Sequence, residues 1–448
     1  MSPGTARPRL TVLGTGYLGA THAVCMADLG FQVLGMDVDR AKIERLLAGE
    51  VPFYEPGLEP LLRKNLEAGR LRFTTSYAEV ADFGDVHFLC VGTPQQAGSY
   101  AADLSYVDAV VAGLVPHLRR ESLVVGKSTV PAGTAQLIAS RIDRDAPGGR
   151  DAGGAVDVAW NPEFLREGFA VEDTVHPDRL VFGIRSAYGE AMLRKAFAPI
   201  LDAGTPAVIT DFATAELVKV AANAFLATKI SFINAMAEVC EATGADVKKL
   251  SESLSHDDRI GGRFLHAGLG FGGGCLPKDI RAFMARAEEL GVDQALSFLR
   301  EVDAINLRRR DRTVDLATEL VEGSFAGTRV AVLGAAFKPN SDDIRDSPAL
   351  DVASRLLAAG AGVTVYDPAA LENARRQYPQ LCYADSAVAA AVGADVVLHL
   401  TEWREFREMY PAVLGAVVAR RNIVDGRNAL DPTRWRNDGW HYRALGRP

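Results

Sequence analysis

The residues with the clearest chemical potential lie between Gly268 and Asp279, a segment that reads GLGFGGGCLPKD. Five glycines precede a single cysteine, Cys275, and Lys278 and Asp279 follow within four residues. Glycine lets the backbone turn sharply and approach a ligand closely. A nearby lysine favours the thiolate, which is the nucleophilic form of cysteine. The segment therefore predicts a binding loop around a reactive sulfur. The alternative is a flexible turn beside a buried, inert cysteine.

Lys219 and Asn223 lie four residues apart in an apolar stretch, residues 211–243, whose periodicity predicts one long helix. Residues four apart face the same side of a helix. A lysine among apolar neighbours commonly extends its amine to solvent. The functional alternative is a cation and an amide that point together at an oxyanion.

A third polar group follows the predicted strand 156–160, in the run from Asn161 to Gly168 (NPEFLREG). Two carboxylates and an arginine are unusual where a plain turn would suffice. Glu163 is a candidate acid or base, because a partly buried carboxylate is readily tuned towards neutrality. A solvated turn of arginine and glutamate is the alternative.

A glycine turn near the N-terminus has the pattern of a dinucleotide site. The turn (GTGYLG) joins a predicted strand, 9–13, to an apolar helix, 20–29, and the next strand, 32–36, ends at Asp37. Such glycines permit a tight turn and close approach of a pyrophosphate to a helix N-terminus. The residues expected to contact the cofactor here are Gly14, Gly16, Tyr17, Leu18 and Gly19. A turn needed only for packing is the alternative.

Asp37 is expected to accept hydrogen bonds from the adenosine ribose hydroxyls, which favours NAD over NADP. Lys42 lies five residues further on. It either serves a 2′-phosphate or is a lysine on a helix surface. Two further predicted strands, 86–91 and 123–127, end in loops that carry Thr93 and Thr129. Ligands of open α/β sheets lie outside the carboxyl ends of the strands, so both threonines are candidate cofactor contacts, with a turn role as the alternative.

The order of predicted elements indicates an α/β protein with two Rossmann-like, doubly wound domains joined by a long central helix and a helical middle domain. Strands and helices alternate up to the stretch 211–243, and a further helical pattern covers residues 280–321. The alternation restarts at Gly327, with strands at 329–333, 363–366, 394–400 and 422–424. We therefore expect an NAD-binding domain (1–205), a helical dimerisation and substrate domain (206–322) and a nucleotide-sugar-binding domain (323–448).

Composition restricts the possible partners. The 448 residues are 48% hydrophobic and 24% charged, as is usual for globular proteins, and the net charge of −8 argues against nucleic acid. The five cysteines form no CxxC pair, so no disulfide framework or metal site is expected. Residues 1–9 lack the apolar core of a signal peptide, and no run of about 18 apolar residues occurs. We expect a cytoplasmic protein that does not bind a membrane.

The motifs, taken together and in order, resemble the UDP-glucose/GDP-mannose dehydrogenase family. They are the run from Asn161 to Gly168, the pair Lys219 and Asn223, the segment from Gly270 to Asp279, and the later segments 336–338 (AFK), 343–348 (DIRDSP) and 425–427 (DGR). The similarity spans nearly the whole chain and is strongest to the bacterial members that oxidise UDP-glucose.

The resemblance implies an NAD-dependent, four-electron oxidation of the C6 alcohol of UDP-glucose to the carboxylate of UDP-glucuronate. Cys275 would attack the aldehyde to form a thiohemiacetal, which is oxidised to a thioester and then hydrolysed. Lys219 and Asn223 would stabilise the oxyanion, Asp279 would orient water or act as a base, and Glu163 would serve hydrolysis. The implied catalytic set is Cys275, Lys219, Asn223, Glu163, Asp279 and Thr129.

Binding residues follow from the same resemblance. Beyond the glycine turn, the expected cofactor contacts are Asp37, Lys42, Thr93, Thr129, Glu167, Lys278 and Arg345. The expected substrate contacts are Phe164, Leu165, Arg166, Lys219, Asn223, Arg259, Phe264, Phe271, Gly272, Phe337, Lys338 and Arg427. Arg259 matches a family arginine that reaches the sugar of the neighbouring subunit, so the resemblance implies a homodimer or a higher homo-oligomer.

Some features depart from the family pattern or leave the substrate open. Many members have a serine immediately before the cysteine, where this chain has Gly274.

GDP-mannose is an alternative substrate. The last four residues of the cysteine segment, Leu-Pro-Lys-Asp, argue against a UDP-N-acetylhexosamine. A non-catalytic nucleotide-sugar binder and a two-electron 3-hydroxyacid dehydrogenase are alternatives of other kinds. The arginines 308–310 match no family role, and a solvated helix face is expected for them.

Overall fold

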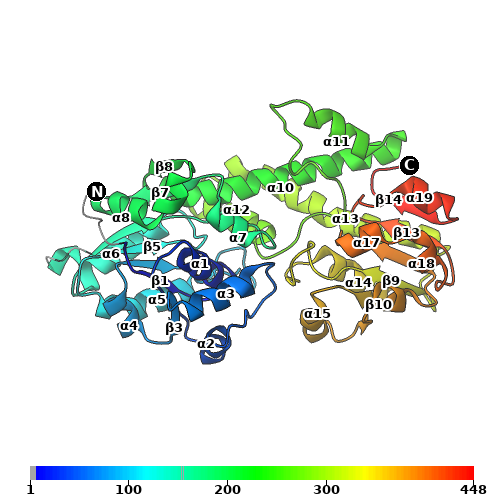
Figure 1. The fold of residues 1–448 in the computed structure, drawn as a ribbon. Helices are drawn as coiled ribbons and strands as arrows, with labels where there is room; N and C mark the ends of the chain where they lie inside the picture. Colours follow the sequence, from blue (N-terminus) through cyan, green and yellow to red (C-terminus); the bar gives the residue numbers. More distant parts are fainter. Residues whose placement is uncertain (1–6, 153, 155) are drawn as a thin grey trace. The chain divides into compact units, whose positions relative to one another are not determined.

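The structure is a computed structural model, which describes residues 7–152, 154 and 156–448. The chain forms two compact units, Met1–Ala222 and Asn223–Pro448 (Figure 1). Each unit contains a mainly parallel sheet with helices packed on it, as expected for two Rossmann-like domains. The predicted fold class is therefore confirmed. The predicted boundaries of three domains stay a prediction.

The described part of the first unit holds an eight-stranded sheet in the order β3-β2-β1-β4-β5-β6-β7-β8. All neighbouring strands are parallel except β6 and β7. The strands are β1 (Leu10–Leu13), β2 (Val33–Met36), β3 (Leu71–Thr74), β4 (Val86–Leu89), β5 (Ser122–Gly126), β6 (Val156–Trp160), β7 (Leu180–Ile184) and β8 (Ala207–Thr210). The order reverses between β1 and β4, which is where an open α/β sheet binds its ligand.

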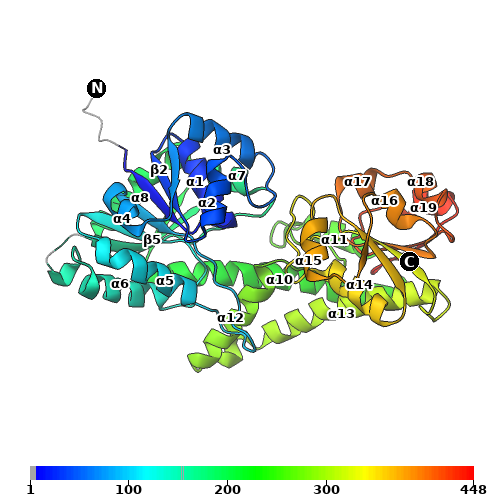
Figure 2. The same cartoon turned by 90° about the horizontal axis from the view of Figure 1, so that it is seen from below.

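Helices cover both faces of this sheet (Figure 2). The core on one face includes residues of α1 (Tyr17–Asp28), α3 (Leu58–Glu67) and α8 (Ala187–Ala196), and the core on the other includes α4 (Tyr77–Phe83), α5 (Ser105–Leu114) and α6 (Thr134–Asp145). The remaining α-helices described before α10 are α2 (Arg40–Leu47), α7 (Ala170–Val175) and α9 (Ala198–Asp202). Burial on both faces explains why the inner strands are continuous apolar runs rather than alternating ones.

The predicted long helix is α10 (Phe212–Thr243), with 32 residues. Asp211 begins it by accepting a hydrogen bond from the Thr214 amide (2.8 Å), and Gly244 ends it in the left-handed conformation (φ 76°). One correction concerns its apolarity. An 18-residue window of α10 has a mean hydropathy of 1.3, so the chain does contain a stretch that passes a length-and-composition test for a membrane span. The core helix of a soluble protein passes the same test, and 44% of the window is buried.

The second unit, all of whose residues are described, contains a parallel six-stranded sheet in the order β11-β10-β9-β12-β13-β14 (Figure 1). Its strands are β9 (Arg329–Leu333), β10 (Gly362–Tyr366), β11 (Cys382–Tyr383), β12 (Val396–His399), β13 (Asn422–Asp425) and β14 (His441–Ala444). The helices are α11 (Val247–Ser255), α12 (Leu276–Glu289), α13 (Phe298–Leu320), α14 (Pro348–Ala358), α15 (Leu371–Gln377), α16 (Ala387–Ala391), α17 (Arg404–Glu408), α18 (Pro411–Gly415) and α19 (Pro432–Asn437).

The predicted helical stretch 280–321 needs correction, because it comprises parts of two helices. Helix α12 ends at Glu289, and Gly291 (φ 72°) takes a left-handed conformation before α13 starts at Phe298.

A second correction concerns the arginines 308–310. Arg309 and Arg310 are buried, with 1% and 4% exposure, rather than solvated. Arg309 pairs with Glu241 (3.0 Å) of α10, and Arg310 pairs with carboxylates outside α13.

Candidate active site and cofactor site

The glycine turn combines two glycines that the fold requires with one that faces open space. Gly14 has a φ of 90° and donates to the Met36 carbonyl (2.8 Å). A Cβ at Gly19 would lie 1.8 Å from the Gly14 carbonyl oxygen, so α1 packs against the turn only without a side chain there. A Cβ at Gly16 would meet nothing within 4 Å. Gly16 also starts α1 without a side-chain cap, which leaves helix amides for a phosphate.

Asp37 lies at the end of β2, where the sequence predicts a ribose contact. Its Oδ2 accepts hydrogen bonds from the Thr15 amide (2.9 Å) and from Lys42 Nζ (2.9 Å). Its Oδ1 accepts from the Asp39 amide (3.0 Å) and, having two lone pairs, can accept a second hydrogen bond. Burial by itself would raise the pKa of Asp37, but these hydrogen bonds outweigh it and hold the pKa below its usual value. Lys42 is therefore engaged with Asp37 rather than being only a surface lysine.

Tyr17 belongs to a buried network that the sequence analysis did not detect. Its hydroxyl donates to Glu55, whose two carboxylate oxygens accept from the amides of Gly168 (2.7 Å) and Ala170 (2.7 Å). Burial, followed by the Glu55 carboxylate, raises the pKa of Tyr17. Glu55 thus ties the glycine turn to the loop that carries Glu167. In the sequence, Glu55 is only a carboxylate before Pro56 and Gly57, a pattern that predicts an ordinary turn.

Thr93 and Thr129 follow β4 and β5, and the structure brings their loops together. The Thr93 hydroxyl donates to the Thr129 carbonyl (2.7 Å), and the Ser128 hydroxyl donates to the Val91 carbonyl (2.6 Å). Parallel strands end at the same edge of the sheet, which explains the proximity. The part of Thr129 in catalysis stays a prediction.

Glu163 and Lys219 come together within the first unit. Lys219 Nζ lies 3.2 Å from Glu163 Oε1, and only 6% and 13% of their side chains are exposed. The ring of Phe164 lies below the ammonium group, with its centroid 5.7 Å away. Glu163 Oε2 accepts a hydrogen bond from the Leu165 amide (2.6 Å). The amine of Lys219 is thus buried beside a carboxylate and an aromatic face, which excludes the alternative of a lysine extended into solvent.

A second buried lysine supports the same loop. Lys127 directly follows β5 and donates to Asn161 Oδ1 (2.9 Å), and the Asn161 amide group donates to the Val181 carbonyl (2.9 Å). Burial lowers the pKa of Lys127. Asn161 is the first residue of the predicted active-site run, so this contact fixes where the run begins. At the other end, Arg166 turns to Asp173 (2.7 Å) and the Phe169 ring, and its predicted substrate contact stays a prediction.

Cys275 lies at the start of α12 in the second unit, and its residue is exposed. Within the first turn of that helix, Asp279 is buried (2% exposed) and donates its backbone amide to the Cys275 carbonyl (2.8 Å). Its carboxylate accepts from Asn223 Nδ2 (2.6 Å) and pairs with Lys278 (2.8 Å). Cys275 is the N-cap residue of α12, and Lys278 and Asp279 lie in the first turn that follows it. The structure thus joins Asn223 to Asp279 and Lys219 to Glu163.

Hydrogen bonds from other segments hold the glycine segment before Cys275 at several points. Buried asparagines hold it at two points: Asn234 accepts from the Gly268 amide (2.9 Å), and Asn306 accepts from the Phe271 amide (2.8 Å) and donates to its carbonyl (2.9 Å). The Gly273 amide donates to the Arg345 carbonyl (2.8 Å). Neither asparagine can be recognised from the sequence, since a lone asparagine within a helix gives no signal of its partner.

Arg427 ties the same segment to two other loops of the second unit through three backbone carbonyls. Its guanidinium donates to the oxygens of Gly270 (2.8 Å), Leu400 (2.7 Å) and Phe337 (3.1 Å). The guanidinium therefore orders the loop, and a direct contact of Arg427 with substrate stays a prediction. Phe337 also borders the glycines, because a Cβ at Gly273 would lie 2.8 Å from its ring. Phe264 is one of the non-glycine residues with positive φ (65°), at the start of the predicted sugar loop.

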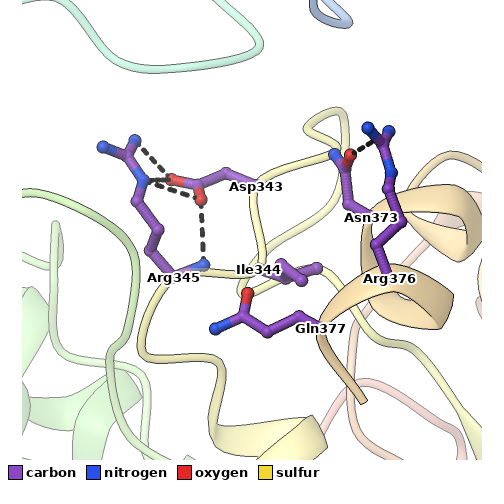
Figure 3. Close-up of a pocket in the computed structure, with 6 residues that line it drawn as sticks. All are labelled: Asp343, Ile344, Arg345, Asn373, Arg376 and Gln377. Atoms are coloured by element: carbon purple, nitrogen blue, oxygen red, sulfur yellow. Dashed lines mark hydrogen bonds and ion pairs between the residues drawn. The ribbon is translucent and has the colours of Figure 1, made fainter. Parts of the chain in front are cut away.

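The surroundings of Gly274 explain why this chain has glycine where many family members have serine. A Cβ at position 274 would lie 2.2 Å from the Arg345 guanidinium carbon, so this arginine occupies the space that a serine side chain would need. Arg345 also forms an ion pair with Asp343 (2.7 Å). Both line an open pocket of about 390 Å³ with Ile344, Asn373, Arg376 and Gln377 (Figure 3).

Arg259, which is predicted to reach the sugar of the partner subunit, lies on the surface. Its side chain is 88% exposed and pairs with Asp257 (2.6 Å).

Comparisons with known proteins cover the whole chain. Three domains of the UDP-glucose/GDP-mannose dehydrogenase family match in order: the NAD binding domain at residues 8–201, the central domain at 213–308 and the UDP binding domain at 331–432. A UDP-glucose 6-dehydrogenase of Pseudomonas aeruginosa is 42% identical over 98% of each chain. The structure of a UDP-glucose dehydrogenase from Pyrobaculum islandicum superimposes with a TM-score of 0.90 at 37% identity, covering 100% of both chains. That of a UDP-D-ManNAc dehydrogenase from Pyrococcus horikoshii has a TM-score of 0.86 at 27% identity, covering 98% of this chain and 99% of the other.

Proposed function

Because the chain belongs to the UDP-glucose/GDP-mannose dehydrogenase family and is an NAD-dependent dehydrogenase, we propose that it oxidises the C6 alcohol of UDP-glucose to the carboxylate of UDP-glucuronate. The observation that carries this proposal is the full-length similarity to UDP-glucose 6-dehydrogenases, together with an anchored glycine loop that presents Cys275 at the start of α12. The same similarity favours UDP-glucose over an N-acetylated sugar, since identity is higher to the UDP-glucose enzyme of known structure (37%) than to the UDP-D-ManNAc enzyme (27%).

The first unit has a site that fits NAD. Gly16 leaves open space at the uncapped N-terminus of α1, where a pyrophosphate would bind, and Asp37 Oδ1 can accept a second hydrogen bond, which a ribose hydroxyl would donate. Thr93, Thr129, Glu167, Lys278 and Arg345 are proposed as further contacts. NAD⁺ bound there supplies the hydride acceptor for each of the two oxidation steps. Lys42 neutralises part of the Asp37 charge and keeps its Oδ2 occupied.

Cys275 is the proposed covalent catalyst. Its sulfur adds to the C6 aldehyde, and the carbonyl oxygen takes up a proton, which gives a thiohemiacetal. Loss of a hydride and of the hydroxyl proton converts this adduct into a thioester. Water then adds to the thioester carbonyl, the carbon–sulfur bond breaks, and the products are the carboxylate and the free thiol. A covalent intermediate explains how one protein completes two oxidations without releasing the aldehyde.

The polar residues have distinct parts in these steps. Lys219 and Asn223 are proposed to stabilise the oxyanion that forms at C6 when sulfur or water adds. Glu163 is proposed to accept a proton from the attacking water, and its bond to the Leu165 amide fixes its orientation. Asp279 holds Asn223 in place through the 2.6 Å hydrogen bond and is the second candidate for orienting water.

The UDP binding domain at residues 331–432 implies that the nucleotide binds in the second unit. Phe264, Phe271, Gly272, Phe337 and Lys338 are the proposed contacts there. Phe164, Leu165 and Arg166 of the first unit are further proposed substrate contacts. Arg427 supports this surface through the carbonyls of Gly270 and Phe337.

Cytoplasmic location is part of the proposal, since all five cysteines are free.

A homodimer is also proposed, on the basis of one face of α10. Phe225, Phe232 and Val239 follow one another at intervals of seven residues and are 67%, 47% and 53% exposed. Seven residues are two helical turns, so the three side chains form one apolar stripe, and such a stripe is typical of an interface between helices. We expect Phe232→Asp to convert the dimer into monomers in light scattering, whereas a surface change such as Lys249→Asp leaves the mass unchanged.

The exposed Arg259 is proposed to serve the sugar bound by the partner subunit. Arg259→Ala and Cys275→Ser variants should each be inactive as pure proteins. Mixed and allowed to exchange subunits, they should recover roughly a quarter of the wild-type activity, because half of the dimers then contain one complete site. Absence of any recovery in a mixture with proven exchange would contradict the shared site.

The decisive test of the reaction is the yield of NADH with each nucleotide sugar. We expect two NADH and one UDP-glucuronate per UDP-glucose, and little NADH from GDP-mannose or UDP-N-acetylhexosamines. NADH from GDP-mannose alone would assign the substrate to the other named branch of the family. Cys275→Ser should abolish full turnover, and an unchanged yield of two NADH per sugar in this variant would exclude the thioester. Binding of UDP-glucose without any NADH would support a non-catalytic binder instead.

A further inference from the structure

Arg310 of helix α13 is a buried arginine that connects the helix to the partly buried carboxylates of Asp346, after β9, and Asp351. The side chain is 5% exposed. Nη2 donates to Asp346 Oδ1 (2.8 Å), and Nη1 donates to Asp351 Oδ2 (3.0 Å) on α14. Buried ion pairs add little net stability, because desolvation offsets most of the attraction, but they fix the relative positions of the groups that they join.

A second arginine holds the other oxygen of Asp346. Arg281 Nη1 donates to Asp346 Oδ2 (3.2 Å), and the same guanidinium is held by both oxygens of Asp303 (3.1 Å each). Arg281 lies on α12, the helix that begins directly after Cys275. Asp346 has a φ of 45°, a left-handed conformation that aspartate and asparagine tolerate better than most residues. The carboxylate therefore joins α12 to α13 from a backbone position that is itself constrained.

The segment around Asp346 also packs directly on the glycines before Cys275. The Gly273 amide donates to the Arg345 carbonyl (2.8 Å). A Cβ at Gly272 would lie 2.3 Å from the Asp346 carbonyl oxygen, so the two backbones touch there. Asp346 is consequently connected to Cys275 from both sides, through the loop that precedes it and through the helix that follows it.

We propose that Asp346 is a positioning residue for Cys275, held by Arg281 and Arg310. The inference rests on the proposed thioester chemistry, because a sulfur that is displaced fails to capture the aldehyde. It gives Arg310 a role that the sequence pattern did not assign. A displacement of about 1 Å in an active site costs on the order of 100-fold in rate.

The test uses Asp346→Asn in the full-length protein. Asparagine keeps the tolerance for a left-handed backbone but removes the charge that both arginines bind. Asp351→Asn is the matched control, since it removes a carboxylate from the same Arg310 but does not touch the glycine segment. Hydrogen exchange of a peptide that covers residues 269–276 measures loop order without any substrate. The ratio of NADH formed to UDP-glucose consumed, with semicarbazide present to trap free aldehyde, measures capture by Cys275.

We expect Asp346→Asn to accelerate exchange in that peptide, to lower kcat by roughly 10- to 100-fold, and to reduce the ratio below two with trapped aldehyde. Asp351→Asn should leave the exchange and the ratio of two unchanged. Partial unfolding lowers activity without altering the ratio, so the ratio separates positioning from stability. A ratio of two in Asp346→Asn, unchanged exchange, or equal effects in both variants would overturn the inference.

Two further results keep the inference testable. Should Asp346→Asn fail to fold, Arg310→Lys replaces it, since lysine keeps the positive charge but not the paired donors. This variant should show the same changes in hydrogen exchange and in the NADH ratio, to a smaller extent. Normal exchange together with two NADH per UDP-glucose would overturn the inference. Should the wild type form no NADH from UDP-glucose, the proposed function fails, while the contrast in hydrogen exchange between the two aspartate variants still decides whether Asp346 orders the loop.

Discussion

The ammonium of Lys219 lies 3.2 Å from Glu163 Oε1, although the two residues are 56 positions apart in the chain. One is on α10 and the other is in the loop after β6. The pair places an amine beside the carboxylate that is proposed to activate water. Each group thereby limits where the other points, and Phe164 closes one side of the pair.

Replacing Glu163 should separate acylation of Cys275 from hydrolysis. Glu163→Gln keeps the size of the side chain but cannot accept the proton, so we expect kcat to fall by about 100-fold or more. The thioester should then accumulate, and intact-mass spectrometry should detect the added UDP-glucuronyl group on Cys275. Glu172→Gln, an exposed position on helix α7 after the same loop, is the control and should show no adduct. Loss of activity in Glu163→Gln without an adduct would contradict the role in hydrolysis.

The glycine turn offers two substitutions with opposite expected results. Gly16→Ala adds a methyl group into open space, so the melting temperature should stay within about 2 °C of wild type while KM for NAD rises strongly. Gly19→Ala places a Cβ 1.8 Å from the Gly14 carbonyl oxygen and should prevent stable folding. Thermal unfolding and steady-state kinetics check both. Normal NAD binding by Gly16→Ala would show that the pyrophosphate does not bind at this turn.

Asp37 and Lys42 should differ in their effects on cofactor binding. Lys42 occupies only Oδ2 of Asp37, so Lys42→Ala should change KM for NAD by less than about threefold. Asp37→Asn removes the charged acceptor for the ribose and should raise KM for NAD by about tenfold or more. Parallel measurements with NADP report selectivity. Equal effects of the two substitutions on KM for NAD would contradict a ribose contact at Oδ1.

Acid should weaken the first unit through Asp157. This carboxylate on β6 is 3% exposed, bonds to Ser186 and pairs with Arg185 (2.6 Å) and Arg150 (3.1 Å). Burial would raise its pKa, but the bonds from Ser186 and Arg185 outweigh burial, and the pKa is lowered. A lowered folded-state pKa contributes stability above the unfolded-state pKa of about 3.9, and this contribution is lost as the pH falls through the folded-state pKa.

We therefore expect Asp157→Asn to lower the free energy of unfolding by about 3 kcal/mol at pH 7 and by less at pH 3. Urea titrations at the two pH values measure the difference. Asp145→Asn is the control, because Asp145 is exposed and its pairing with Arg144 lies on the surface. The same loss of stability at both pH values would show that the charge of Asp157 is not what matters.

The prediction of secondary structure succeeded where periodicity was long or a strand was fully buried. Helix α10 and strands β1, β2, β6 and β9 lie within about two residues of their predicted positions. It failed at residues 290–297, where the apolar spacing of α12 and α13 continues in register across Gly291. Spacing alone does not show that a chain has turned. Arg309 and Arg310 were misjudged for a similar reason, because their carboxylate partners lie 36 to 71 residues away.

The sequence by itself determined which reactive groups this protein carries, because the cysteine, the glycines, and the amine and carboxylate types occur in motifs whose spacing is local. Only the tertiary structure decided which groups meet. It paired Lys219 with Glu163 and Asn223 with Asp279, revealed Glu55 behind Tyr17, and turned Arg427 towards three carbonyls. The physical reason is that a buried polar group must find a partner, and packing rather than sequence distance determines which partner is within reach.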